Sequence, residues 1–255
     1  MISSEAKGLF EKLDMPYPAV ALKFHVCRPQ GVPKYDGQPK AFCEFLHDAQ
    51  VNEGSFYMTA EDDSCNGKVI LGMADKPPVA ASGQSGPDFE MYRQNAANRR
   101  IYQEMPVLVR GTCNYVQFTR LSECDFDPDL VVCVADADSA YILLRATSYI
   151  SGDFWESRST PVISCCWMYS YPVITGKVNF ITTGFYHGLK RRKMYPAGLT
   201  MISIPFRKLD EVCTALGEMP WTTIAFREDE ESKAELERRM VRWKEMADEC
   251  SDLIK

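Results

Sequence analysis

Histidine is scarce in this chain of 255 residues, which contains only His25, His47 and His187. This scarcity argues against the histidine-based zinc and iron sites of many metalloenzymes. The sequence also lacks a G-x-x-x-x-G-K-[S/T] phosphate loop, a G-x-G-x-x-G fingerprint, a G-x-S-x-G nucleophile elbow and any C-x-x-C pair. These absences argue against the common nucleotide-binding, α/β-hydrolase, zinc-finger and thioredoxin-like classes.

Long apolar runs are also missing. No stretch approaches the roughly 18 apolar residues that a membrane-spanning helix requires. The segment from Met1 to Lys12 has no basic start followed by an apolar core, so we expect no signal peptide. The formal net charge of -6 offers no general attraction to nucleic acid or to an anionic membrane. We therefore predict a cytoplasmic protein that binds neither nucleic acid nor a membrane.

The overall composition is that of a folded globular protein, with 45% apolar and 25% charged residues. We predict strands over 20–26, 55–59, 107–110, 115–119, 130–135, 179–183 and 199–204. We predict helices over 4–13, 41–50, 89–104, 139–149 and 206–216. Because these elements are uneven in length and show no regular βαβ rhythm, they indicate an α+β fold with a mixed or antiparallel sheet and flanking helices.

The C-terminal segment carries a regular apolar pattern. Its apolar residues follow spacings of 4, 3, 4, 3 and 4: Leu236, Met240, Trp243, Ala247, Cys250 and Ile254. With Ser232 and Glu235 as a capping box, the pattern predicts a long amphipathic helix over 228–255, following a single α+β domain over 1–227. The helix either packs on its own domain or, because the period is near 3.5, pairs two subunits of a homodimer.

Cysteine, in contrast, is abundant, and twelve methionines make the chain richer still in sulfur. The ten cysteines are Cys27, Cys43, Cys65, Cys113, Cys124, Cys133, Cys165, Cys166, Cys213 and Cys250. In a long chain without an export signal, such cysteines indicate soft thiolate ligation rather than a disulfide framework. At least half of them are expected to be small buried hydrophobes, Cys133 among them.

Three cysteine neighbourhoods differ from the rest. Cys43 and His47 share one face of a predicted helix at i,i+4. Cys65 lies in a turn at a predicted helix start, where amide donors favour the thiolate. Cys165 and Cys166 are adjacent and precede Trp167, which we expect to shield the site.

Around these cysteines the sequence resembles a known family. The matching segments are 42–43, 47–49, 56–57, 63–67, 71–72, 126–132, 164–165, 172–179 and 204–205. Together they resemble the ArCR (archaeal conserved region) family, domain-of-unknown-function family 169, whose members occur in archaea and many anaerobic bacteria. The resemblance covers 18–216 and leaves out the C-terminal helix. It implies three matching cysteine positions, Cys43, Cys65 and Cys165, and no reaction.

Three thiolates from separate loops can hold a cubane 4Fe-4S cluster with one open iron, near a small-molecule pocket. Glu44, His47 or Cys166 would supply a fourth ligand. A zinc site needs the same cysteines and could include His47. Without a metal, the alternatives are a reactive thiol at Cys65, a vicinal disulfide between Cys165 and Cys166, or inert packing. We predict an iron–sulfur protein of unknown reaction, with no catalytic residue assigned.

Two further segments are expected at the mouth of this pocket. The basic run 190–193 would bind a small anionic substrate there, unless it is a solvated loop. The segment 82–86 is expected to be a loop that acts as a lid or a plain connector. A second class of function also fits the sequence, namely a non-catalytic anion-binding or assembly module that dimerises through its C-terminal helix.

Overall fold

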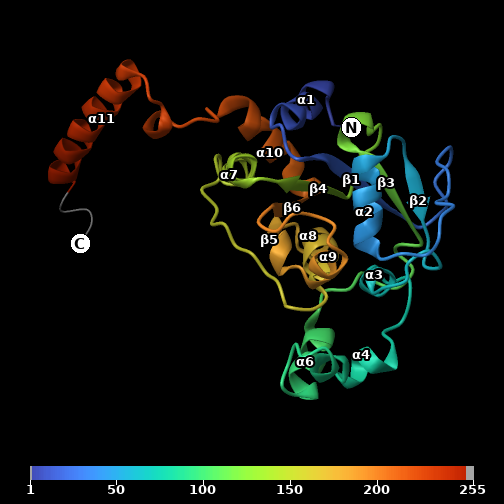
Figure 1. Ribbon diagram of the computed structural model, residues 1–255. Helices are drawn as coiled ribbons and strands as arrows, with labels where there is room; N and C mark the ends of the chain where they lie inside the picture. The colour runs from blue at the N-terminus through green and yellow to red at the C-terminus, as the bar shows by residue number, and fades with distance from the viewer. Residues whose placement is uncertain (1, 251–255) are drawn as a thin grey trace. The chain divides into compact units, whose positions relative to one another are not determined.

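Six strands form one sheet in the computed structural model, which describes residues 2–250 (Figure 1). The strands are β1 (Tyr17–His25), β2 (Phe56–Met58), β3 (Tyr115–Arg120), β4 (Leu130–Ala135), β5 (Asn179–Thr182) and β6 (Thr200–Pro205). They lie in the order β2-β3-β1-β4-β6-β5, and each neighbouring pair is antiparallel. The predicted α+β fold is therefore confirmed.

The chain divides into two compact units, Met1–Gly217 and Glu218–Lys255. The first unit contains the whole sheet. The boundary lies after Gly217, whereas the sequence pattern placed it after residue 227.

The central strands are buried on both faces. All six residues of β4 are inaccessible to solvent, as expected for the run Leu-Val-Val-Cys-Val-Ala. Side chains alternate between the two faces of a strand. Val132 and Val134 join the large core cluster on one face, while Val131 and Cys133 are buried on the other. Cys133 is thus a core residue, as predicted.

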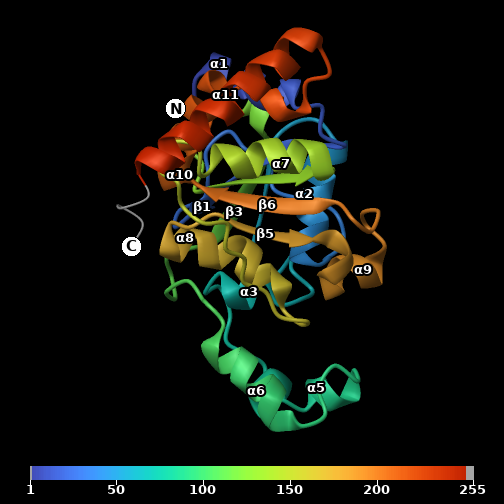
Figure 2. The same ribbon diagram turned by 90° about the vertical axis from the view of Figure 1, so that its left-hand side faces the viewer.

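Helices cover both faces of the sheet. In the first unit they are α1 (Ser4–Lys12), α2 (Phe42–Val51), α3 (Gly67–Ile70), α4 (Pro78–Ser82), α5 (Ser85–Asp88), α6 (Asn95–Glu104), α7 (Ala137–Ala146), α8 (Tyr171–Thr175), α9 (His187–Arg192) and α10 (Phe206–Glu218). A π-helical turn, η2 (Cys166–Ser170), leads directly into α8. Helix α7 contacts β4 and β6, and α8 contacts β6 from the other side of the sheet (Figure 2). Helix α2 packs on β1 and β3.

Two predicted elements are wrong. Residues 107–110 form no strand; the segment is irregular, although the Leu108 amide donates to the Ile70 carbonyl at 2.9 Å. The helix predicted over 89–104 begins only at Asn95, because Glu90 has a φ of 56°, outside the right-handed helical region.

The segment predicted as a loop over 82–86 instead belongs to a small helical group. Helices α4, α5 and α6 pack on one another and form a group of their own in both views (Figures 1 and 2). Gly83 ends α4 with a φ of 78°, and a Cβ there would lie 2.1 Å from the Asn95 carbonyl oxygen. A Cβ on Gly86 would lie 2.5 Å from that of Asn98. These contacts require glycine, so the two glycines serve close helix packing rather than flexibility.

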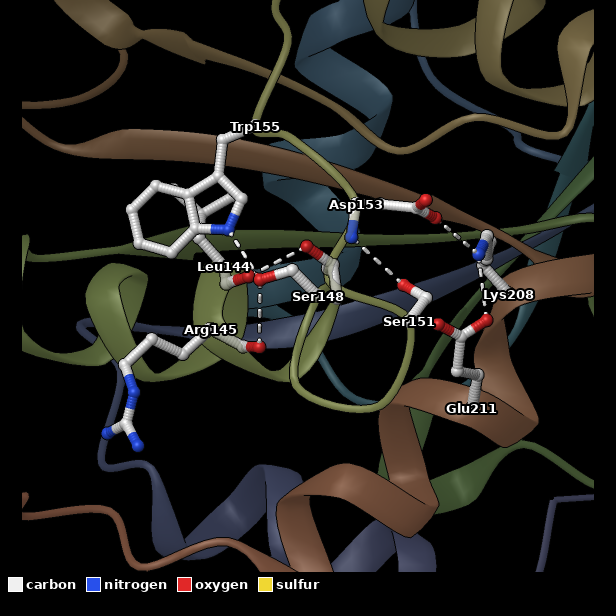
Figure 3. Close-up of polar contacts among 9 residues, drawn as sticks. Leu144, Arg145, Ser148, Ser151, Asp153, Trp155, Lys208 and Glu211 are labelled. Carbon is white, nitrogen blue, oxygen red and sulfur yellow. Dashed lines mark hydrogen bonds and ion pairs between the residues drawn. The ribbon is translucent and has the colours of Figure 1, made fainter. Parts of the chain in front are cut away.

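A long connection follows α7 and is attached to α10 near its start. The Trp155 indole donates to the Ser148 hydroxyl at 3.0 Å, and Lys208 pairs with both Asp153 (3.3 Å) and Glu211 (2.7 Å) (Figure 3). A cavity of about 270 Å³ lies beside these residues. Because Lys208 already has two carboxylate partners, we assign this region a structural role.

The second unit contains the C-terminal helix α11 (Glu230–Glu249). Its N-cap is Asp229, whose carboxylate accepts from the Ser232 amide at 2.8 Å, so the predicted capping box at Ser232 is wrong by one turn. Met240 and Trp243 are exposed, and Ile254 lies outside the described residues. None of the helices described within 2–250 combines the length and apolar character needed to span a membrane.

Asn179 ties the segment that follows Cys165 to the sheet. Its buried amide nitrogen donates to the carbonyls of Arg158 and Trp167, both at 2.9 Å. In Asn179→Asp, a carboxylate oxygen would face these carbonyls and be buried without a donor. We expect the free energy of unfolding in urea to fall by about 3 kcal/mol.

Asn114→Asp is the matched control, because that exposed amide makes one hydrogen bond, to the Val26 carbonyl at 2.9 Å. We expect it to cost less than about 1 kcal/mol. Equal losses for the two variants would contradict the anchoring role of Asn179.

Candidate functional site

A pocket of about 380 Å³ contains all three cysteines that the sequence singled out. Cys43 comes from the first turn of α2, Cys65 from the turn before α3, and Cys165 from the residue preceding η2. The remaining pocket walls come mainly from α5, α6, α9 and the residues just before Cys165. The pocket therefore gathers thiols that lie more than 100 residues apart in the sequence.

Helix α2 presents Cys43 to the pocket because a hydrogen bond at the helix start and the packing of Phe42 fix its first turn. The Glu44 carboxylate accepts from the Ala41 amide at 2.8 Å, which satisfies one of the free donors at the helix start. Next to Cys43, the buried Phe42 ring packs edge-on against Tyr169 at 4.7 Å and against Phe118 at 5.4 Å.

The turn carrying Cys65 is organised by the buried carboxylate of Asp63. Its two oxygens accept from the backbone amides of Cys65 (3.1 Å) and Lys68 (2.7 Å). The amide of Phe42 also donates to Asp63, which links the turn to α2. Burial raises the pKa of Asp63, and the three amide donors oppose this increase.

A close backbone approach holds this turn against α2. A Cβ on Gly67 would lie 2.3 Å from the Cβ of Phe42. Lys40 and Ser64 add two backbone hydrogen bonds, from Lys40 N to Asp62 O at 3.0 Å and from Ser64 N to Lys40 O at 2.9 Å. Cys43 and Cys65 are therefore brought together by backbone contacts.

Backbone strain precedes Cys165. Ile163 has a φ of 55°, a left-handed conformation that is rare for a β-branched residue and costs on the order of 1–3 kcal/mol. The turn is held by the Ser164 hydroxyl, which donates to the Thr160 carbonyl at 2.9 Å, and by the Cys166 amide, which donates to the Ile163 carbonyl at 3.1 Å. Strain of this kind persists where the surroundings fix the backbone, and it is common at functional sites.

The thiols lie close enough to affect one another electrostatically. Burial raises the pKa of Cys43 to about 12, with a contribution from Cys65 that Arg192 opposes. Burial also raises the pKa of Cys165 well above its ordinary value, and the other two pocket cysteines add to the increase. Cys43 and Cys165 are therefore neutral thiols in the pocket as it stands.

Two buried tyrosine hydroxyls lie beside the thiols. Tyr186 is 3% exposed and lines the pocket, and Cys165 is near enough to raise its pKa further beyond the effect of burial. Tyr169 is inaccessible to solvent, and Cys43 acts on its pKa in the same way. The hydroxyl of Tyr186 therefore has the Cys165 thiol as its polar neighbour.

The charged side chains that line the pocket are both arginines of α9. The Arg192 guanidinium bonds to the Glu44 carboxylate at 3.1 Å and to the Gly188 carbonyl at 3.2 Å, so α9 is joined to α2. Arg191 is exposed at the mouth, next to His187. Burial, followed by these two arginines, lowers the pKa of His187.

Some residues expected at the site lie elsewhere. His47 does not line the pocket; its ring faces Tyr195 at 5.4 Å and Tyr17 at 5.9 Å. Cys166 is fully buried and is also absent from the pocket wall, as is Trp167, whose indole donates to the Thr160 hydroxyl at 2.9 Å. The other six cysteines lie outside the pocket: Cys27, Cys113, Cys124, Cys133, Cys213 and Cys250.

Sequence reasoning missed three residues that shape the site. Tyr186 and Tyr169 belong to no motif, and Asp63 lies in the segment 63–67 of the family resemblance with no role assigned to it. The position of Asp63, two residues before Cys65 and five before Lys68, is typical of a side chain that accepts from turn and helix-start amides. That spacing could have identified Asp63 from the sequence, whereas no local sequence pattern indicates a role for Tyr169 or Tyr186.

The thiols share a pocket without converging on a single point. No group of three or more His, Cys, Asp or Glu side chains in the described part of the chain is arranged to hold one metal ion. All ten cysteines are within the described residues, and each is a free thiol.

Comparison with known proteins identifies a family and a relative that is aligned over most of the chain. The family model DUF169, described as uncharacterised ArCR, matches residues 8–215. Uncharacterized protein MJ0308 of Methanocaldococcus jannaschii is 24% identical over 220 residues, which cover 84% of this chain and 93% of that protein. No solved structure matches the chain significantly.

Asp63→Asn tests whether this carboxylate organises the cysteine turn. The substitution replaces one acceptor oxygen by an NH₂ group that faces a backbone N–H donor. We expect the free energy of unfolding to fall by about 1–3 kcal/mol. Amide hydrogen exchange at Cys65 and Lys68 should become faster.

Asp36→Asn is the control, since Asp36 is an exposed loop carboxylate. It should change neither stability nor the exchange of these two amides. Unchanged exchange in Asp63→Asn would show that the turn is held by other contacts.

Proposed function

This chain belongs to the ArCR family, DUF169, and we propose that its cysteine pocket holds an iron–sulfur cluster on Cys43, Cys65 and Cys165. The observation that carries the proposal is the convergence of three thiols from separate segments in one pocket. The cytoplasmic location is part of the same proposal, because free cysteines persist in a reducing compartment.

The chemistry of the pocket suits such a group. Thiolates are the usual ligands of iron–sulfur clusters, and three of them leave one iron open. The hydroxyl of Tyr186 faces Cys165 and would donate a hydrogen bond to its thiolate. The pocket wall includes two arginines and no carboxylate, and Arg192 lowers the pKa of Cys43 against the larger effect of burial.

A cluster and a single zinc ion require different spacings of the thiols. Bond lengths near 2.3 Å place the sulfurs around one zinc ion about 3.5–4 Å apart, whereas a cubane separates them by roughly 6–7 Å. The described residues contain no group of three or more His, Cys, Asp or Glu side chains arranged to hold one metal ion. Zinc, with His47 or Cys166 as a further ligand, would require both side chains to turn into the pocket.

A bound cluster would supply electron transfer or Lewis acidity at the open iron. The protein's own groups would orient and insulate it. Arg192, fixed by Glu44, would balance the charge of the Cys43 and Cys65 thiolates. Phe42 and Tyr102 would limit the access of water.

Metal analysis of anaerobically purified protein tests the proposal. We expect brown protein with broad absorbance near about 400 nm and about four iron and four sulfide ions per chain. Cys43→Ala, Cys65→Ala and Cys165→Ala should each lose most of the iron while retaining the circular dichroism of the folded protein.

Cys27→Ala is the matched control, because Cys27 is exposed and lies outside the pocket. It should retain the wild-type iron content. Colourless protein with less than one iron per chain under strict anaerobiosis would refute the cluster. A stoichiometric zinc ion that the three pocket variants lose would establish the zinc alternative.

A second candidate function, assembly, rests on the apolar side of α11. Trp243 is 57% exposed and Met240 48% exposed in the second unit, one turn apart. Ion pairs between Glu235 and both Arg238 and Arg239 occupy other positions of the helix. The spacing near 3.5 residues suits a second copy of the same helix.

Trp243→Ser tests this pairing. We expect light scattering to give the mass of two chains for the wild type and of one chain for the variant, because the substitution removes a large apolar contact from the shared face. Lys244→Ser, at the neighbouring position, should leave the dimer intact. A monomeric wild type would rule out pairing through α11.

A further inference from the structure

The mouth of the cysteine pocket has a charge opposite to that of the whole chain. The formal net charge is -6, yet the ionised side chains that line the pocket are Arg191 and Arg192. Glu44 compensates Arg192, whereas a positive charge without a carboxylate partner in a concave site attracts small anions.

The two arginines differ in the partners that they have. Arg192 is committed to Glu44 and to the Gly188 carbonyl. The Arg191 side chain makes no hydrogen bond or ion pair with the other residues of 2–250, although it lines the same pocket. The planar guanidinium of Arg191 is therefore available to a ligand, and guanidinium groups bind carboxylates through two parallel hydrogen bonds.

Aromatic side chains line the same pocket as Arg191. Phe89 and Tyr102 line the pocket, and the Phe89 ring lies 6.3 Å from that of His187. A strongly hydrated ion without apolar surface would gain nothing from such a wall, whereas an organic acid with an apolar body would bury that body there.

We propose that the mouth of the pocket binds a small organic carboxylate, with its carboxylate on Arg191 and its apolar body against Phe89 and Tyr102. This inference rests on the proposed function, since it names the class of substrate that would lie beside the cofactor. It adds a specific anion-binding residue, Arg191, to a site defined so far by its thiols.

Calorimetric titration of the full-length protein, both metal-free and anaerobically reconstituted, tests the proposal with matched pairs of probes. The probes are acetate with acetamide, benzoate with benzamide, and inorganic phosphate. We expect benzoate to bind more tightly than acetate and both neutral amides to bind far more weakly. Arg191→Gln should weaken carboxylate binding roughly ten- to a hundredfold.

Lys190→Gln is the control, because Lys190 is an exposed neighbour that does not line the pocket. It should bind benzoate as the wild type does. Equal affinity for amides and acids, unchanged affinity in Arg191→Gln, failure of both carboxylates to bind, or tighter binding of phosphate than of benzoate would each overturn the proposal.

Iron content, measured on the same samples, separates this inference from the cofactor. Arg191→Gln should keep the wild-type iron content. Brown protein that binds neither carboxylate would refute the substrate class and leave the cluster standing. Colourless protein that binds benzoate through Arg191 would refute the cluster and retain the carboxylate site.

Discussion

The arrangement of the site depends on one buried carboxylate. Asp63 is 1% exposed and accepts backbone amides from Cys65, Lys68 and Phe42. These amides belong to the cysteine turn, to the start of α3 and to the start of α2. A buried carboxylate is stable only when such donors satisfy it, so the three segments and the carboxylate require one another. Cys43 and Cys65 are neighbours in space as a consequence.

The buried thiols of this pocket are neutral, and ionising them there is unfavourable. Burial raises the pKa of Cys43 to about 12, so ionising it in the pocket needs a strong compensating charge. Arg192 supplies part of that charge and is held in place by Glu44. The strained backbone of Ile163 is a further free-energy cost at the same place. Contributions that lower the stability of the fold and gather at one pocket are typical of a site selected for binding rather than for stability.

Much of the fold was predictable from local patterns. The spacing of apolar residues, every second residue in a strand and every third or fourth in a helix, reflects which side chains are buried. The sheet strands other than the one expected at 107–110, and helices α1, α2, α7 and α10, appear near the predicted positions. The shared site of Cys43, Cys65 and Cys165 was predicted from their sequence neighbourhoods and from the family resemblance, because no single motif marks it. The helices α4 and α5 were missed because prolines and glycines suggested a loop, while the packing contacts of Gly83 and Gly86 with α6 are tertiary.

The position of His47 shows that an i,i+4 spacing on a helix does not by itself place two side chains in the same pocket. Four residues along a helix turn the side chain by about 40° and move it about 6 Å along the axis. That is enough for Cys43 to enter the pocket while His47 meets Tyr17 and Tyr195 instead. Arg192 and Tyr186 line the pocket, and both come from a segment more than 130 residues farther along the chain. The identity of the groups around a thiol is therefore decided by tertiary contacts. For this pocket those contacts supply arginine and tyrosine, and the histidine that lines it is His187 rather than His47.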